Sequence, residues 1–353
     1  MEVKNIQKFR AALLAWNRKS NSREMPWKGI KDPYHIWLSE VILQQTRVDQ
    51  GIKYYERFVS RYPSLKDLAE APEDEVFKLW EGLGYYSRCR NLLVSARDLL
   101  KNSGGTMPQT YAGLLKMQGV GPYTAAAISS FAYNLPHAVV DGNVIRVLAR
   151  YFAVSLSPAT AYGRKFFNEL AGQCLSPRNP AIYNQAIMDF GATICRPRNP
   201  ECTLCPLQKD CQAFAASQTA AYPAKVAAPP KQVRHLLFIK LTVKDQVMVQ
   251  KRQRQGIWPM LYTYAILEGD MVHNLSGQEV EERLYLEMGV SGKIKAITGI
   301  KRHILTHQVL FAKLAAVECT NIPEIPGFEI FPQSRLEQLA FPVLLRLLEK
   351  ELE

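Results

Sequence analysis

The sequence predicts a protein of two domains, an all-helical domain followed by a smaller α+β domain. The chain of 353 residues is long enough for two hydrophobic cores. Its first part repeats apolar residues at helical spacing, whereas its last part mixes strand-like and helical segments. Between them, residues 216–233 are rich in Ala and Pro, a composition typical of an extended linker. We therefore expect domains at residues 1–215 and 234–353.

Six segments of the first domain have apolar residues three and four positions apart, which predicts amphipathic helices. They are residues 6–16, 34–48, 52–61, 74–79, 90–100 and 144–152. Residues 114–128 predict a helical hairpin, in which Gly119 and Gly121 permit a tight turn and Pro122 begins the second helix. Free amide groups at such a helix start can bind a phosphate, although an ordinary hairpin without a ligand is an alternative.

The second domain combines predicted strands with predicted helices. Strands are predicted at residues 235–243, 246–251, 262–267 and 309–318. A helix is predicted at residues 278–288, with Ser276 as its N-cap, and another at residues 342–352, which begins with a proline. This mixture predicts the α+β class for the second domain.

The charge of the chain points to a polyanion as its partner. Lys and Arg outnumber Asp and Glu by 44 to 32, which gives a net charge of +12. Each phosphate that such a surface neutralises releases counterions, so nucleic acid is favoured. A basic protein without a nucleic-acid partner is the alternative on charge alone. We expect no membrane association, because no apolar run approaches the length of a membrane span.

Four cysteines lie close together, in the pattern Cys195-x6-Cys202-x2-Cys205-x5-Cys211. A structural zinc site usually has two short Cys-x2–4-Cys pairs, and the outer gaps of six and five residues are larger than that. An all-thiolate four-iron–four-sulfur cluster suits the spacing better. Zinc is an alternative. Disulfides are a second one, disfavoured because the charged first ten residues do not resemble a secretory signal.

Two carboxylates are candidates for acid–base chemistry. Glu40 shares a predicted helix face with Trp37 and Leu43, where desolvation would raise its pKa and suit it to act as a general acid. Asp141 precedes a predicted helix, where it could act as an N-cap and also face a developing cation. A solvent-facing helix carboxylate and a plain N-cap are the respective alternatives.

Together these features resemble the helix–hairpin–helix DNA glycosylase superfamily, and within it the adenine DNA glycosylases. Residues 33–46 resemble the acid-bearing helix of that family, residues 82–88 its minor-groove wedge and residues 140–144 its catalytic aspartate segment. The cysteine spacing matches its cluster loop, which here spans residues 195–211. The resemblance covers nearly the whole chain. It implies a base-excision-repair enzyme that flips out and hydrolyses adenine mispaired with 8-oxoguanine or guanine in duplex DNA.

The resemblance also implies a role for each matching residue. Glu40 would protonate the extruded adenine and Asp141 would stabilise the oxocarbenium-like sugar, while Tyr123 and Asn143 orient these two carboxyl groups. Cys195, Cys202, Cys205 and Cys211 would hold a [4Fe-4S] cluster. The residues implied to contact the base or the DNA are Arg23, Trp27, Lys28, Leu43, Gln45, Tyr85, Gly119, Gly121 and Gln185.

One position bears on the type of reaction. The related endonuclease III group has a lysine where this chain has Tyr123, and that amine forms a Schiff base and cuts the backbone. We therefore expect a monofunctional glycosylase, with an endonuclease III-like glycosylase/lyase or a non-catalytic DNA-binding iron–sulfur protein as alternatives. Its expected partner is double-stranded DNA containing an A:8-oxoguanine or A:G mispair. We expect a monomer of the cytoplasm, associated with the nucleoid.

The second domain resembles a Nudix fold whose hydrolase signature is degenerate. Arg283 and Leu286 stand in place of two metal-binding carboxylates, so we expect no pyrophosphatase activity. The family recognises 8-oxoguanine through an aromatic-Ser-His turn, and Leu305, Thr306 and His307 occupy that place here. A hydroxyl and the imidazole are thus kept, whereas the aromatic ring is replaced. A plain strand turn is the alternative for this segment.

Overall fold

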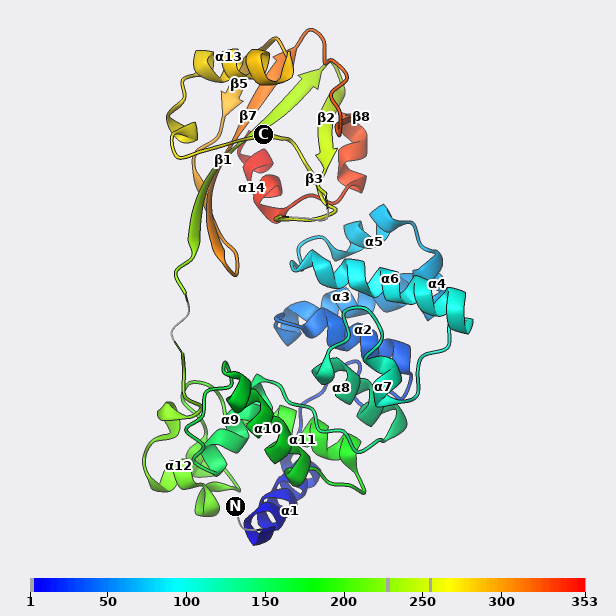
Figure 1. The fold of residues 1–353 in the computed structure, drawn as a ribbon, viewed down its shortest axis with the longest axis vertical. Coiled ribbons are helices and arrows are strands. Elements are labelled where there is room, and N and C mark those ends of the chain that lie inside the picture. Colours follow the sequence, from blue (N-terminus) through cyan, green and yellow to red (C-terminus); the bar gives the residue numbers. More distant parts are fainter. Residues whose placement is uncertain (1–2, 227–228, 254–255, 353) are drawn as a thin grey trace. The chain divides into compact units, whose positions relative to one another are not determined.

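The computed structural model describes residues 3–226, 229–253 and 256–352. The chain divides into two compact units, Met1–Glu70 with Asn91–Ala227, and Ala71–Arg90 with Ala228–Glu353 (Figure 1). Residues 71–90, which lie within the predicted 1–215 domain, thus group with the second unit. The predicted linker at 216–233 includes residues 227 and 228, which lie outside the described residues, and the domain limits stay a prediction. In the described ranges, no helix has the length and apolarity that a membrane span needs.

The first unit is helical, as its apolar spacing predicts. Its helices are α1 (Val3–Ser20), α2 (Pro33–Leu43), α3 (Val48–Arg61), α4 (Leu65–Glu70), α7 (Tyr111–Leu114), α8 (Pro122–Tyr133), α9 (Gly142–Tyr151), α10 (Ala161–Cys174), α11 (Pro180–Thr193) and α12 (Gln212–Ala215), with 3₁₀ turns at Cys202–Leu204, Gln208–Asp210 and Thr219–Ala221. Helix α6 (Tyr86–Ser103) begins in the second unit and ends in the first. Side chains of α1, α9, α10 and α11 form one buried cluster that includes Phe9, Leu148, Leu170 and Phe190. This packing fixes the start of α9, where Asp141 lies.

The helix predicted over residues 34–48 is wrong at its carboxyl end. Helix α2 ends at Leu43, and α3 begins at Val48. Gln45 has a φ of 56°, in the left-handed region that interrupts a right-handed helix. The apolar spacing runs on across the turn because a second helix follows it. As a result, Gln45 lies exposed at the turn.

The helical hairpin predicted at residues 114–128 is wrong in its first helix, because α7 ends at Leu114, where the prediction begins it, and turns follow up to Gly121. The second helix, α8, is where it was predicted. Gly119 has a φ of 79°, and a Cβ at this position would lie 2.7 Å from the Cβ of Asn91 in α6. Both the backbone conformation and this close approach therefore require glycine. Gly121 is the N-cap of α8, and Pro122 takes the first helical position as predicted.

The second unit contains an eight-stranded sheet with helices. Its elements are α5 (Glu73–Trp80), β1 (Gln232–Val243), β2 (Gln246–Lys251), β3 (Tyr262–Thr263), β4 (Ala265–Glu268), α13 (Gly277–Met288), β5 (Gly292–Ile297), β6 (Lys301–Ile304), β7 (Gln308–Cys319), β8 (Glu329–Pro332) and α14 (Val343–Leu352), with 3₁₀ turns at Val272–Asn274 and Gln333–Gln338. The main path of the sheet is β3-β2-β1-β7-β5, and β1 and β7 are parallel. The single strand predicted over residues 262–267 is two strands, and β5, β6 and β8 were not predicted. Their side chains are mostly exposed or half-buried, so they lack a clear apolar alternation.

Two helices cover opposite faces of this sheet (Figure 1). Leu237 and Ile239 of β1 pack in one buried cluster with Leu284 of α13. Lys240, whose side chain points to the other face, donates to Glu349 of α14 over 3.4 Å. Helix α13 begins with a capping box formed by Ser276, which confirms the N-cap predicted for it.

Candidate active site

Glu40 is buried in the middle of α2, with 5% of its surface exposed. Burial raises the pKa of its carboxyl to about 7, an effect opposed by a hydrogen bond with Tyr123 and supported by the negative charge of Asp141. The expectation that desolvation would raise this pKa is therefore confirmed. A carboxyl with such a pKa can hold a proton at neutral pH and give it to a bound group.

Asp141 is the N-cap of α9 and accepts two short hydrogen bonds. Its Oδ1 accepts from the backbone N–H of Val144, and its Oδ2 accepts from Nδ2 of Asn143, both over 2.7 Å. These donors suit the ionised carboxylate, which can only accept hydrogen bonds. The position at the start of a helix also favours negative charge. The predicted N-cap is confirmed, and both oxygens of the carboxylate are bound by hydrogen-bond donors.

Glu40 and Asp141 open into the same cavity, which has a volume of about 160 Å³. The predicted residues that line it are Arg23, Trp27, Glu40, Leu43, Tyr123, Asp141, Asn143 and Gln185. Thr46 and Met188 line it as well and were not singled out from the sequence. Lys28 lines a neighbouring cavity of about 200 Å³, which shares Trp27 and Glu40 with the first.

A buried carboxylate that the sequence analysis missed organises one wall of this cavity. Asp189 in α11 is fully buried, and it accepts from Arg23 over 2.9 Å and from Lys28 over 3.0 Å. It also accepts from Nε2 of Gln185 over 2.9 Å. Because the amide nitrogen of Gln185 is engaged in this way, its amide oxygen is left to face a ligand. The four-residue spacing of Gln185 and Asp189 on one helix was the signal that could have revealed the pair.

A second residue that the sequence analysis missed connects Asn143 to the cysteine segment. Nη2 of Arg146 donates to Oδ1 of Asn143 over 2.8 Å, and its Nε donates to the carbonyl of Cys195 over 2.8 Å. Nη2 also donates to the carbonyl of Gly191 over 2.7 Å. Since the Asn143 oxygen is held by Arg146, its NH₂ group is turned towards Asp141. The guanidinium therefore sets the orientation of an amide at the active site.

The four clustered cysteines line one cavity, and all seven cysteines of the chain are free thiols. Cys202 begins a 3₁₀ turn and Cys205 caps its end, so this single turn supplies two thiols three positions apart. Nη1 of Arg150 lies 3.4 Å from Sγ of Cys195 and donates to it. Within the described part of the chain, no three His, Cys, Asp or Glu side chains are grouped to hold a single metal ion.

The other predicted DNA contacts lie outside this cavity. In the first unit, Gln45 and both turn glycines, Gly119 and Gly121, are exposed. In the second unit, Tyr85 has a φ of 49° and 44% of its surface exposed. Its hydroxyl lies 3.1 Å from Oγ1 of Thr306.

Leu305, Thr306 and His307 form the turn between β6 and β7, in which Thr306 and His307 are exposed. The hydroxyl and imidazole groups of the turn are accessible to a ligand. Arg283 of α13 forms an ion pair with Glu287 over 3.3 Å, and Leu286 is exposed. Neither of these two residues supplies an oxygen ligand of the kind that a magnesium ion prefers.

Comparisons with known proteins agree with this geometry. The family model of the HhH-GPD superfamily base excision DNA repair proteins matches residues 38–171. An adenine DNA glycosylase of Buchnera aphidicola subsp. Baizongia pistaciae is 34% identical over 266 residues, which are 72% of this chain and 73% of the relative. The adenine DNA glycosylase of Mus musculus is 40% identical over 65% of this chain, and the match spans 46% of the mouse protein. A thermostable thymine-DNA glycosylase of known structure is 31% identical, with a TM-score of 0.56 over 60% of this chain and 98% of the other.

Proposed function

Because the chain belongs to the adenine DNA glycosylases of the HhH-GPD superfamily of base-excision DNA repair proteins, we propose that it hydrolyses adenine from A:8-oxoguanine and A:G mispairs in duplex DNA. The observation that carries this proposal is the meeting of Glu40 and Asp141 at one cavity. The two carboxyl groups have different surroundings, one buried with a raised pKa and one held by hydrogen-bond donors. Such a pair can combine an acid with an anion.

In the proposed reaction, the adenine leaves the base stack and enters the cavity. Glu40 gives its proton to a ring nitrogen of the imidazole part of adenine, which makes the base a better leaving group. The glycosidic bond then breaks with its electron pair on the adenine, and Asp141 faces the positive charge that develops on the sugar. Water adds to that sugar carbon and gives up a proton, which completes the hydrolysis. Tyr123 holds Glu40 through a hydrogen bond, and Asn143 holds Asp141. The Gln185 amide, oriented by Asp189, is placed to accept from the amino group of the base.

The proposal is tested by single-turnover excision on duplexes that carry A:8-oxoguanine, A:G or A:T. We expect strand breaks after alkali with the first two duplexes and none above background with the third. The matched A:T duplex controls for non-specific cleavage, because only the base opposite adenine differs. Equal rates on all three duplexes would contradict the proposed specificity, and no alkali-dependent breaks on any of them would contradict the enzymatic activity.

We also propose that the enzyme removes the base without efficiently cutting the strand. The phenol of Tyr123 beside Glu40 has no amine with which to form a Schiff base, although Lys28 lies in the neighbouring cavity. The ammonium of Lys28 donates to Asp189 and to the carbonyl of Arg23. Borohydride added during the reaction is expected to trap only a small fraction of the protein on the DNA. Trapping of most of the protein would overturn this part of the proposal, and a Lys28→Gln variant would show whether that residue is responsible.

We propose that Cys195, Cys202, Cys205 and Cys211 hold a [4Fe-4S] cluster. The four free thiols line one cavity, and their spacing along the chain is wider than the two short Cys pairs of a usual zinc site. When bound, the cluster would order the loop that follows Cys195, whose carbonyl accepts from Arg146. The purified protein is expected to contain about four iron and four sulfide per chain, and less than half of that after Cys202→Ala. One zinc per chain, or a metal-free disulfide-bonded protein, would contradict the cluster.

For the second unit we propose a Nudix-like fold that contacts 8-oxoguanine without hydrolysing nucleotides. The sheet with a helix on each face supports the fold, and the exposed hydroxyl and imidazole of Thr306 and His307 support the contact. These two groups can exchange hydrogen bonds with the edge of an oxidised purine. On helix α13, Arg283 and Leu286 stand at two positions where the resemblance implies metal-binding carboxylates, and neither side chain can supply an oxygen ligand.

A further inference from the structure

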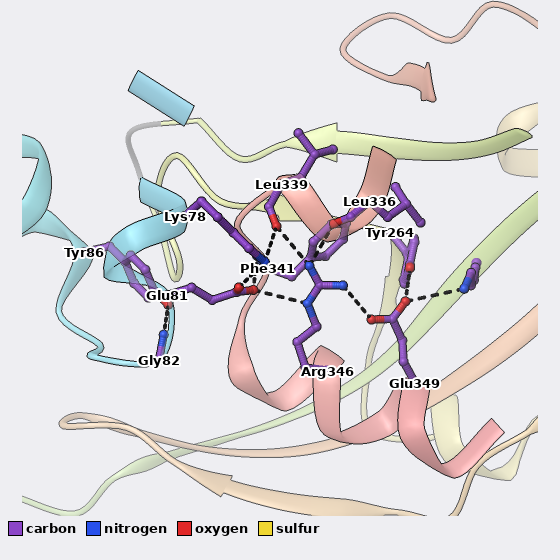
Figure 2. A network of polar contacts seen from close by, with 11 residues as sticks. Lys78, Glu81, Gly82, Tyr86, Tyr264, Leu336, Leu339, Phe341, Arg346 and Glu349 are labelled. Carbon is purple, nitrogen blue, oxygen red and sulfur yellow. Dashed lines mark hydrogen bonds and ion pairs between the residues drawn. The ribbon is translucent and has the colours of Figure 1, made fainter. Parts of the chain in front are cut away.

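We propose that Glu81 and Arg346 are positioning residues: within the second unit they lock the loop that carries Tyr85 to the segment around the start of α14, and so help to set the preference for the base opposite adenine. The identity of that base rests on the proposed function, whereas the lock itself rests on the contacts described below. We use the name Glu81–Arg346 lock for Lys78, Glu81, Arg346 and Glu349 together with the backbone groups that they bind (Figure 2).

Glu81 is the C-cap of helix α5, directly after Trp80, and the exposed fraction of its side chain is 17%. Its Oε1 accepts from the backbone N–H of Phe341 over 3.0 Å and from Nε of Arg346 over 3.2 Å. Its other oxygen forms an ion pair with Lys78, one turn earlier in the chain. Two of these three donors come from residues 341–346, more than 250 positions later in the sequence, so the carboxylate connects α5 to the start of α14 (Figure 2).

Arg346 is held from several directions. Its Nη2 donates to the carbonyls of Leu336 and Leu339, each over 2.9 Å, and its Nη1 pairs with Glu349 over 3.3 Å. Its guanidinium carbon lies 4.5 Å from the ring centroid of Phe341. A planar guanidinium with this many fixed partners loses little freedom when it binds a further carboxylate. The lock therefore differs from an isolated surface ion pair, which would contribute little.

The other end of α5 is also bound within the second unit, to strands β2 and β3. Nζ of Lys251 in β2 lies 2.6 Å from Asp74 and 3.1 Å from Glu73, both in the first turn of the helix. The hydroxyl of Tyr262 donates to Asp74 over 3.2 Å. Helix α5 is thus fixed at both ends, and the Glu81–Arg346 lock is the anchor nearer to Tyr85.

The three residues after Glu81 transmit this position to Tyr85. Gly82 and Gly84 have φ values of 94° and 74°, and Leu83 between them is the one buried side chain of this three-residue loop. Polar contacts also hold the loop, such as the bond from Nε1 of Trp80 to the carbonyl of Gly84 over 3.0 Å. Trp80 belongs to α5, and a displacement of α5 would therefore move the loop.

The Tyr85 ring lies where it can act on a nucleic acid. It is partly exposed, the guanidinium of Arg88 lies 5.3 Å from its centroid, and its hydroxyl reaches Thr306 in the exposed turn. An exposed aromatic ring of this kind can stack on a base. Because the lock fixes α5 within the unit that also carries Thr306, it keeps the Tyr85 ring at a constant position relative to the exposed turn. Loss of the lock is expected to weaken the joint recognition of one base by both.

The first measurement needs neither DNA nor activity. In Arg346→Met the aliphatic stem over Phe341 is largely kept, whereas the donors that Arg346 contributes to the lock are removed. We expect amide hydrogen exchange of residues 71–90 in the full chain to speed up by roughly tenfold or more, with the core strands unchanged. Arg283→Met, which breaks the exposed ion pair with Glu287 on α13, is the matched control and should leave residues 71–90 as in the wild type. Unchanged exchange of residues 71–90 in Arg346→Met would overturn the lock.

The second measurement compares single-turnover rates and dissociation constants for A:8-oxoguanine and A:G duplexes. The ratio of the excision rate on the A:8-oxoguanine duplex to that on the A:G duplex is expected to fall roughly fivefold to thirtyfold in Arg346→Met. Glu81→Ala should behave alike and does not rely on Arg346→Met being foldable, while Glu81→Gln, which keeps an acceptor oxygen, should restore most of the ratio. If the variant lowered the excision rates on both duplexes by the same factor, the role of the lock would be purely structural and the inference would be overturned. If the wild type itself shows no preference, the proposed specificity fails, and the exchange experiment still decides on the lock.

Discussion

Glu40→Gln is expected to lower the single-turnover rate of adenine excision at pH 7 by a factor of roughly 10²–10⁴, the usual contribution of a general acid. Glutamine keeps the size of the side chain and an oxygen that can accept from Tyr123, but it has no proton to give. Rates measured on an A:8-oxoguanine duplex at saturating protein separate this loss from weaker binding. Glu56→Gln, the same change on an exposed face of α3, is the control and should retain the wild-type rate. Equal rates for Glu40→Gln and wild type would remove Glu40 from the role of acid.

The pH dependence of the reaction follows from the same side chain. Burial raises the pKa of Glu40 to about 7, so its protonated fraction falls as the pH rises through that value. We therefore expect the wild-type rate to decrease about tenfold per pH unit above roughly pH 7. The residual rate of Glu40→Gln should lack this decrease. A wild-type rate that rises continuously to pH 9 would contradict the assignment.

At high pH, Glu40→Gln is expected to be more stable than the wild type although it is less active. Because the pKa of Glu40 is raised in the folded state from its ordinary value of 4.5 to about 7, the folded protein binds an extra proton between these two values. The free energy of unfolding therefore falls as the pH rises towards 7 and stays lower above it. Glu40→Gln removes the buried charge and is expected to unfold with a free energy higher by on the order of 2 kcal/mol at pH 8, but not at pH 4. Urea unfolding at the two pH values measures the difference.

Asp141→Asn is expected to lower the same single-turnover rate by a factor of roughly 10²–10³, because it removes the charge that faces the developing cation. Asparagine can still accept from the N–H of Val144 and cap α9, so the loss of stability should be small. Its amide would meet the NH₂ of Asn143, which cannot easily turn because Arg146 holds its oxygen. The variant therefore tests charge and the donor pattern together.

Thr160→Asn is the matched control for this variant, since Thr160 caps α10 through a hydrogen bond of 3.0 Å and does not line the active-site cavity. It should leave the rate unchanged. If Asp141→Asn keeps more than about a tenth of the wild-type rate, the carboxylate acts mainly as a helix cap. Thermal unfolding of both variants shows whether a lost rate reflects a lost fold.

Local patterns in the sequence were sufficient for much of the fold and for the two carboxyl groups. The burial of Glu40 follows from apolar neighbours three positions away on one helix, and the capping role of Asp141 follows from the helix that it precedes. The strand at 246–251 and the capping box at Ser276 are equally local. The break at Gln45 could not be predicted in this way, because apolar spacing resumes in the next helix.

By itself the sequence determined which residue types are present for the chemistry and which helices carry them, because periodicity and capping act over a few positions. Only the tertiary structure decided how these residues are held. Arg146 reaches Cys195 across 49 positions, Arg23 reaches Asp189 across 166, and Glu81 reaches Arg346 across 265. Such hydrogen bonds depend on where distant segments of backbone come together. That is set by the packing of the whole unit, and no local pattern in the chain encodes it.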